Sequence, residues 1–377
     1  MKPKTRNKLI FLAIAAIAAF IIIIVDTQGL FSLEPSVFVF AADREVSFGG
    51  RGAVFVADNG FFVSTNESVR FFDNRGREIF RHGITMIHPA LIGRGNYAAV
   101  AEQGGQALVI LNQHSHLYTI RTQAPIVSFA VSHQGLAAVI AFDGINYAIS
   151  VYSPQGLIHS ADTGHFSSTF IPAAIDISND GRFLAISYLD IGDAQMNSVV
   201  QFISLDDGGV FAMTAANHER FIGVIRFMDD NRLLTISDRC ISLINPYSRA
   251  EVLWEIELNN RIASAEFGGN WFAIAYADEL LNHSGRPANT IVVYNLHRQE
   301  IFTYSSPRSI TSLSSKNGSL ILGANHHFTA LSPSGDTIWQ HIAPNNVTAL
   351  HFLDDADTAL AVSPTNAVIL HRTQANE

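Results

Sequence analysis

Short apolar runs separated by turn residues recur along most of the chain, most clearly between Ser309 and Gln340. Three runs of strand length, Ile310–Leu313, Ser319–Gly323 and Phe328–Ser332, are followed by a fourth at Asp336–Gln340. Lys-Asn-Gly lies between the first two runs and Ser-Pro-Ser-Gly before the last. Asn-Gly adopts the positive φ that a two-residue hairpin needs, and Pro followed by Gly favours a tight turn. The segment therefore predicts a four-stranded antiparallel meander.

This unit repeats to the end of the chain. A turn of Gly, Asn or Asp followed by a short apolar run occurs at residues 131–141, 177–187, 227–237, 267–277, 314–324 and 352–363. The predicted first strands of successive units start near residues 46–53, 88, 126, 172, 222, 262, 309 and 346. This spacing centres on about 40 residues, the period of the four-stranded blades of β-propellers.

Two of the repeated segments resemble known propeller repeats. The hairpin ISNDGRFLAIS at 177–187 resembles those of WD40-like and TolB-like (YVTN) propellers, and LSPSGDTIW at 331–339 resembles pyrroloquinoline-quinone-type (PQQ-type) repeats. The similarity covers most of residues 45–372, but the Trp-Asp dipeptide of true WD40 repeats is absent. The chain is thus similar to divergent propellers, and in particular to uncharacterised membrane-anchored propellers of bacterial envelopes.

The resemblance and the repeat spacing predict an all-β propeller of seven or eight four-stranded blades, and we favour eight. The last unit, 347–373, supplies only three strands. We expect Ser36–Phe40 to complete it, because a ring closed by both termini leaves no exposed sheet edge. The alternative fold is a β-sandwich followed by a second β domain.

The N-terminus has the pattern of a membrane anchor. Four basic residues precede Leu9–Val25, a stretch of 17 residues without a polar side chain. A transmembrane helix needs about 20 residues, whereas the apolar core of a cleaved signal peptide, the alternative, usually has about 7–15. Since basic flanks stay inside, the propeller is predicted to be extracytoplasmic on a single-pass membrane protein. The predicted organisation is a cytoplasmic tail at 1–8, an anchor at 9–25, a linker at 26–35 and a propeller at 36–373.

Charge and cysteine usage narrow the possible partners. Apart from the four basic residues of the tail, 20 basic and 33 acidic residues remain, a net charge of −13. An acidic domain lacks the positive surface that nucleic acids require, so we expect none as a partner. Cys240 is the only cysteine, which excludes an intrachain disulfide and any Cys-x-x-Cys site.

The longest predicted loops suggest a binding face. In a propeller, the connections between strands two and three and between blades lie on one face, and Tyr188–Asn197 and Ala277–Asn289 are of this kind. Variable loops on one face of a repeat array often bind ligands, although solvated loops without a ligand are an equal alternative. The candidate binding residues are Asp190, Asp193, Asp278, Glu279, His283 and Arg286.

Enzyme motifs are missing from the sequence. It contains no GxSxG, GxxxxGK[ST] or HExxH pattern, and we expect no catalytic residue, cofactor or metal site. The first hypothesis is therefore a non-catalytic scaffold that binds a protein or cell-envelope partner. The alternative is a quinoprotein-like or hydrolase-like enzyme, which a central channel lined by convergent acids, histidine and arginine would favour. A third is a ligand sensor that signals through a second protein.

Overall fold

The structure is a computed structural model in which residues 42–371 form one compact unit. It describes residues 38–162, 169–192, 197–214, 217–218, 220–258, 261–277, 289–354 and 357–374. The predicted tail, anchor and linker lie outside these residues. No helix of the described ranges is long and apolar enough to cross a bilayer.

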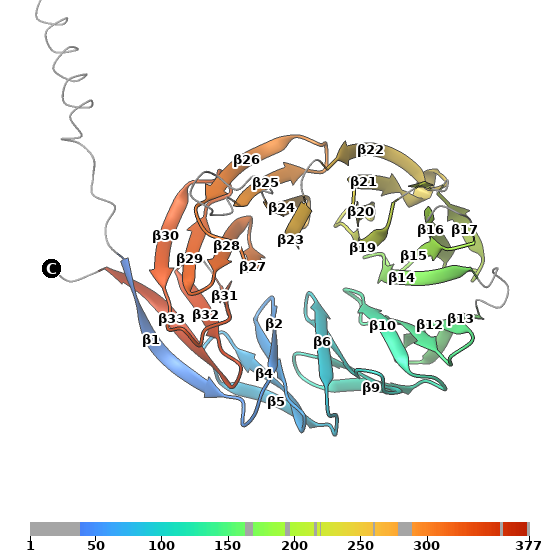
Figure 1. Cartoon of the computed structure of the whole chain (residues 1–377). Helices are drawn as coiled ribbons and strands as arrows, with labels where there is room; N and C mark the ends of the chain where they lie inside the picture. Colours follow the sequence, from blue (N-terminus) through green and yellow to red (C-terminus); the bar gives the residue numbers. More distant parts are fainter. Residues whose placement is uncertain are drawn as a thin grey trace, which may run out of the picture. The chain divides into compact units, whose positions relative to one another are not determined.

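The compact unit is a ring of eight four-stranded antiparallel sheets, each with its first strand at the centre (Figure 1). Blade 1 consists of β2 (Ala53–Ala57), β3 (Gly60–Ser64), β4 (Ser68–Asp73) and β5 (Glu78–Gly83). Blade 2 consists of β6 (Pro89–Arg94), β7 (Tyr97–Glu102), β8 (Ala107–Asn112) and β9 (His116–Arg121). Blade 3 consists of β10 (Ile126–Val131), β11 (Ala137–Phe142), β12 (Tyr147–Ser153) and β13 (Gly156–Asp162).

Blades 4 and 5 each carry a small additional element. Blade 4 consists of β14 (Phe170–Ile177), β15 (Phe183–Asp190), β16 (Asn197–Ser204) and β17 (Val210–Met213), and β18 (Asn217–His218) also pairs with β16. Blade 5 consists of β19 (Ile222–Phe227), β20 (Leu233–Ser237), β21 (Cys240–Asn245) and β22 (Glu251–Glu257). A single 3-10 turn, η2 (Pro246–Ser248), joins the last two of these strands.

Blades 6 and 7 repeat the same meander. Blade 6 consists of β23 (Arg261–Phe267), β24 (Trp271–Ala277), β25 (Asn289–Asn295) and β26 (Glu300–Ser306). Blade 7 consists of β27 (Ser312–Lys316), β28 (Ser319–Ala324), β29 (His327–Leu331) and β30 (Thr337–Ile342). The predicted Asn-Gly hairpin lies between β27 and β28, where Asn317 and Gly318 have φ of 52° and 82°. Positive φ at both central residues matches the right-handed twist of the flanking strands.

The two ends of the chain build blade 8 together. Its inner strands are β31 (Ala349–Phe352), β32 (Thr358–Val362) and β33 (Asn366–Gln374), and its outer strand is β1 (Phe38–Ser47). The main-chain N–H of Phe48 donates to the carbonyl of Thr365, 2.9 Å away. Eight blades and closure of the ring by an N-terminal strand are thus confirmed, although this strand runs to Ser47 rather than ending at Phe40.

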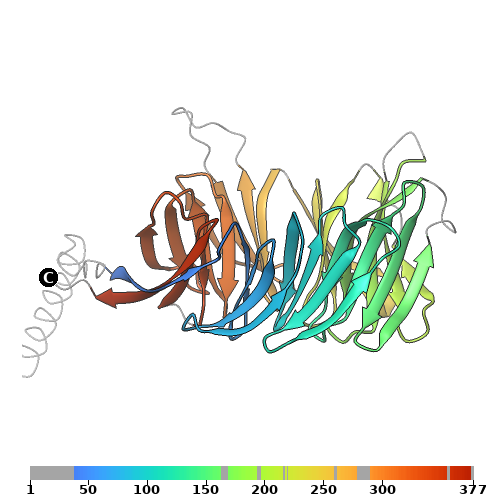
Figure 2. The same ribbon diagram turned by 90° about the horizontal axis from the view of Figure 1, so that it is seen from below.

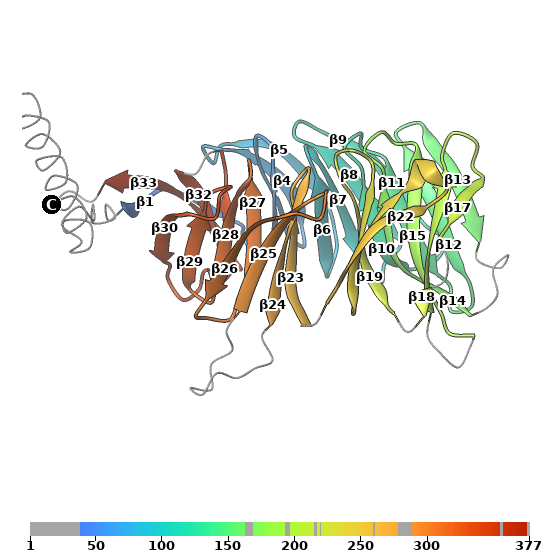
Figure 3. The same ribbon diagram turned by 90° about the horizontal axis from the view of Figure 1, so that it is seen from above.

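Viewed from the side, the strands run between two faces of the ring (Figures 2 and 3). We call the face with the turns from strand one to two and from three to four the hairpin face. The opposite face, with the strand two-to-three and blade-to-blade segments, is the connection face. In each of the first seven blades the register shifts between strands three and four near the hairpin face, for example between Phe71 and Phe72. Such bulges twist an outer strand and blunt its exposed edge.

The hydrophobic core lies between the blades. One cluster joins blades 8 and 1 through Phe48, Phe61 and Ile369, and another joins blades 3 and 4 through Ile140 and Leu184. Because each sheet buries both faces against its neighbours, every blade depends on the ring being complete.

Candidate functional site

Of the six predicted binding residues, the structure describes Asp190. It ends β15 on the connection face, where its Oδ1 accepts a hydrogen bond from the main-chain N–H of Gly192 at 3.0 Å. This contact satisfies the turn, as Asp commonly does. The other five residues, Asp193, Asp278, Glu279, His283 and Arg286, lie outside the described residues, so the predicted loop site stays a prediction.

Apolar side chains on the connection face were not anticipated from the sequence. Ile87, Ile145, Ile191 and Phe221 lie in its connecting segments and are 73%, 85%, 50% and 42% exposed. They follow one another around the ring from the junction of blades 1 and 2 to that of blades 4 and 5. Among the described turns of the hairpin face, Tyr247 is the one large apolar side chain with comparable exposure. The two faces therefore differ in chemical character.

A cavity of about 1180 Å³ occupies the axis at the hairpin face. It is lined by the inner strands and hairpins of seven blades, and its ionisable lining residues are Asp58, Arg94, His133, Arg226, Asp229, Glu266, Lys316 and His351. The central channel is therefore polar, as expected for the enzyme alternative.

One sequence feature would have indicated this polar axis. In six of the eight first strands an ionisable residue occupies one of the last two positions: Arg94, Asp176, Arg226, Glu266, Lys316 and His351. First strands of a propeller surround the axis, so ionisable residues at their hairpin ends converge there.

Arg94 and Asp176 form a buried ion pair that connects blades 2 and 4. The two side chains are 3% and 4% exposed, and Arg94 Nη1 donates to both carboxylate oxygens, at 2.8 and 2.9 Å. Arg94 Nη2 donates a hydrogen bond to the carbonyl of Phe227 in blade 5. The main-chain N–H of Phe227 in turn donates to Asp176, at 2.7 Å. The pair therefore fastens three blades to one another at the axis.

Lys316 fastens the blades on the other side of the ring. Its ammonium donates to the carbonyls of Asp58 at 3.0 Å, of Ala57 at 3.3 Å and of Leu353. These partners belong to blades 1 and 8, whereas Lys316 belongs to blade 7. Burial lowers the pKa of Lys316. Since an ammonium has three donors, this group is fully engaged in ring closure.

Glu266 and Arg226 line the same cavity and keep part of their hydrogen-bonding capacity unused within the described residues. Glu266 Oε1 accepts hydrogen bonds from the main-chain N–H and the hydroxyl of Ser315, at 3.1 and 2.7 Å. Burial raises the pKa of Glu266 despite these bonds. Arg226 has no hydrogen bond or ion pair within the described residues. Its pKa is lowered mainly by burial and, to a smaller extent, by the positive charge of Arg94. Both groups therefore keep atoms that could bind a ligand in the cavity.

His351 gives the axis a dependence on pH. Its Nδ1 lies 2.8 Å from Ser314 Oγ, and burial lowers its pKa to about 4. Below about pH 6.5, His351 binds a proton in the unfolded chain, whereas in the native protein it stays neutral until the pH approaches 4. The stability contributed by neutral His351 is therefore complete above that pH and is lost as the pH falls towards 4.

We expect the free energy of unfolding to fall by about 3 kcal/mol between pH 6.5 and 4 because of this one residue. His351→Gln should remove that part of the pH dependence, whereas His114→Gln, at an exposed turn of the hairpin face, should leave it unchanged. Denaturant unfolding at several pH values measures both. If the free energy of unfolding depends on pH equally in wild type and His351→Gln, the pH dependence does not come from His351.

Eight blades, closure by both termini and a polar axis define the protein as an eight-bladed β-propeller. Residues 47–369 match the model of a family of unknown function, DUF5711, and the chain belongs to that family. No curated protein matches the sequence.

Solved structures of the same architecture include a computationally designed protein, Ika8, with 16% identity and a TM-score of 0.60 over 86% of this chain and 97% of that one. BamB from Moraxella catarrhalis has 12% identity and a TM-score of 0.57 over 90% and 99% of the two chains. Chaetomium thermophilum Sqt1, bound to the N-terminus of ribosomal protein L10, has 13% identity and a TM-score of 0.54 over 87% and 100%. The predicted resemblance to WD40-like and related propellers is confirmed for the fold.

Proposed function

We propose that the protein is a membrane-anchored, extracytoplasmic propeller that binds a protein partner of the cell envelope without catalysing a reaction. The observation that supports this most directly is the arc of exposed apolar side chains on the connection face, Ile87, Ile145, Ile191 and Phe221. Exposed apolar residues that gather on one face of a soluble domain are typical of protein-binding surfaces. Sqt1, with the same fold, is bound to a segment of another protein, which is consistent with this use of a propeller.

Anchoring by residues 9–25 is part of the proposal and rests on the sequence. The basic head and the 17-residue apolar stretch would place the propeller outside the cytoplasm. A reporter that is active only outside the cytoplasm, fused after Glu377, tests this orientation. Activity of a cytoplasm-specific reporter at the same position would contradict it.

A charge placed in the apolar arc should weaken the complex strongly. Each buried isoleucine contributes about 1.5–3 kcal/mol to association, so Ile145→Asp should reduce partner capture by about tenfold or more. Cross-linking in native membranes followed by purification of the full-length protein measures the amount of captured partner. The matched control is Ile79→Asp on the outer strand β5, because Ile79 is also well exposed, at 47%, but lies beside a turn of the hairpin face.

Equal capture by Ile145→Asp and wild type would exclude this arc as the binding surface. Equal losses in both aspartate variants would show only that exposed isoleucines aid solubility or membrane association. Shortening of the 188–197 and 277–289 loops tests the predicted loop residues in the same assay.

The polar axis favours a second candidate, an enzyme that acts at the central cavity. Its specific basis is the convergence of Glu266, Arg226 and His133 on one cavity. Several other groups there are already engaged in fastening blades, so the binding function remains our first proposal. Glu266→Gln separates the two: a scaffold keeps its partner and its cellular role in this variant, whereas an enzyme using this carboxyl group loses its role while the partner stays bound.

A further inference from the structure

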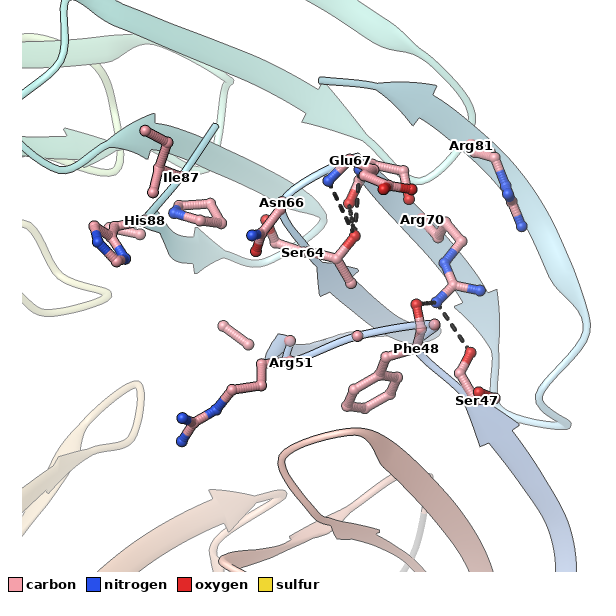
Figure 4. Close-up of a pocket in the computed structure, with 18 of the residues that line it drawn as sticks. Ser47, Phe48, Arg51, Ser64, Asn66, Glu67, Arg70, Arg81, Ile87 and His88 are labelled. Carbon is pink, nitrogen blue, oxygen red and sulfur yellow. Dashed lines mark hydrogen bonds between the residues drawn. The ribbon is translucent and has the colours of Figure 1, made fainter. Parts of the chain in front are cut away.

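A second cavity, of about 860 Å³, opens on the connection face where the ring closes (Figure 4). Three segments form most of its walls: residues 47–53 from the end of β1 to the start of β2, residues 64–68 from the end of β3 to the start of β4, and residues 87–90 at the start of β6. This volume falls within the range of about 300–1,000 Å³ that is usual for small-molecule sites. The cavity is therefore large enough for a ligand well above the size of a single ion.

The cavity carries an excess of positive charge on a chain whose net charge is −9. Arg51, Arg70 and Arg81 line it, and Glu67 is the one carboxylate among its lining residues. Arg81 donates two hydrogen bonds to Glu78, at 2.8 and 2.9 Å, and Arg70 lies 3.7 Å from that same carboxylate. The carboxylate of Glu78 therefore interacts with two guanidinium groups, those of Arg81 and Arg70.

Arg51 is the free cation of this site. Its side chain is exposed and makes no hydrogen bond or ion pair with any part of the chain that the structure describes. Figure 4 shows Arg51 on one side of an open space, with Asn66 and His88 on the other. An anion in this space would gain the guanidinium as a partner.

Two buried polar atoms in the cavity wall lack partners. Ser64 is fully buried and Arg70 is 8% exposed, yet Ser64 Oγ and Arg70 Nε make no hydrogen bond within the described residues. The Nη2 of Arg70 is held by the carbonyls of Ser47 and Phe48, at 3.0 and 2.7 Å (Figure 4). A buried donor without a partner costs about 1–3 kcal/mol, which a ligand or an ordered water that accepts from it would recover.

The main chain of the 47–53 segment adds further donors. Phe48 and Gly52 donate their N–H groups to Thr365 and Pro364, whereas no such bond is found for the intervening Gly49, Gly50 and Arg51 in the described structure. A Cβ at Gly49 or Gly50 would meet no atom within 4 Å, so the backbone there borders open space. Successive free N–H groups beside arginine are suited to an oxyanion.

We propose that this cavity binds an acidic sugar, that is, a saccharide ring that bears a carboxylate or a phosphate. Arg51 and the free N–H groups would hold the acid, and the uncharged polar side chains Asn66, Ser68 and Gln103 offer partners for hydroxyl groups. Ile87 and Pro89 offer apolar surface for the C–H face of a ring. The inference does not rest on the partner protein proposed above, since the ligand would be enclosed by this chain alone.

Calorimetric titration of the full-length protein, in a detergent without a sugar headgroup, tests the inference. Glucuronate and glucose 6-phosphate are the acidic probes, and glucose is the neutral probe. We expect binding of at least one acid in the millimolar range or tighter, with glucose at least about tenfold weaker, because a charge-assisted contact is lost. Binding of one acid but not the other identifies carboxylate or phosphate as the preferred group, and either result supports the proposal.

Arg51→Gln is the decisive variant because its exposed side chain leaves folding undisturbed. It should weaken acid binding by about tenfold without affecting glucose. Arg75→Gln removes the same charge from an exposed turn of blade 1 on the hairpin face and should bind like wild type. The proposal is overturned if neither acid binds, if glucose binds as well as the acids, or if the two arginine variants behave alike.

Discussion

Asp176→Ala is expected to destabilise the propeller by about 3–5 kcal/mol, because it leaves the guanidinium of Arg94 buried without its counter-ion. Asp176 receives two hydrogen bonds from Arg94 and one from the main-chain N–H of Phe227, and both charged side chains are almost completely buried. Their attraction compensates for desolvation only while both are present. Denaturant unfolding of the full-length protein measures the loss.

The double variant Arg94→Met/Asp176→Leu should recover most of that loss, since it removes both buried charges and fills the space with apolar atoms. Asp229→Ala is the matched control, because Asp229 lines the axial cavity together with Arg94 but is exposed. If Asp176→Ala and Asp229→Ala cost the same, the ion pair does not fasten the blades.

The ionisable residues at the axis of this propeller have two roles: some stabilise the ring, and others are available to bind a ligand. Arg94 and Asp176 join blades 2, 4 and 5, and Lys316 joins blade 7 to blades 1 and 8, so these groups hold the ring together. Glu266 and Arg226 lie in the same cavity with much of their bonding capacity unused. A mutation that disables the axis therefore needs a measurement of stability before any loss of function is assigned to a site.

The blade count and the form of ring closure were predictable because both depend on local signals. Turn residues and strand-length apolar runs recur at a regular spacing. The last unit has only three strands, so another part of the chain must supply its fourth strand. The pairing of Arg94 with Asp176 was not predictable, because the residues are 82 positions apart and meet only through the curvature of the complete ring.

The extent of the closing strand was missed for a physical reason. The prediction ended at Phe40 because the following residues, Ala-Ala-Asp-Arg-Glu, are polar or small. The outer strand of a blade has solvent on one side, and the side chains of Asp43, Arg44 and Glu45 are exposed while Val46 is buried. A search for apolar runs therefore truncates outer strands.

The candidate binding face shows the same limit of sequence reasoning. The loops 188–197 and 277–289 were predicted to bind because they are the longest, whereas the exposed Ile145 lies in a short turn between β11 and β12. An isolated isoleucine in a turn has no periodicity, so its exposure becomes apparent only when the flanking strands are placed.

Phe48→Ala should destabilise the protein by about 3–5 kcal/mol, the usual cost of removing a buried phenylalanine. Phe48 is 4% exposed and packs in the cluster between blades 8 and 1, directly after the closing strand. Its loss leaves a cavity at the junction of the first and last blades. Because this junction joins the ends of the chain, we expect it to open before the rest of the ring.

Two measurements separate weak closure from general destabilisation. Limited proteolysis of Phe48→Ala should cut first within residues 38–52, and hydrogen exchange should rise there before it rises in blades 3 to 5. Phe221→Ala, an identical substitution at an exposed position, should change stability by no more than about 0.5 kcal/mol and leave the cleavage pattern unaltered. Uniform loss of protection around the ring in Phe48→Ala would show that the eight blades unfold as one unit, and that closure by β1 is no weaker than any other blade contact.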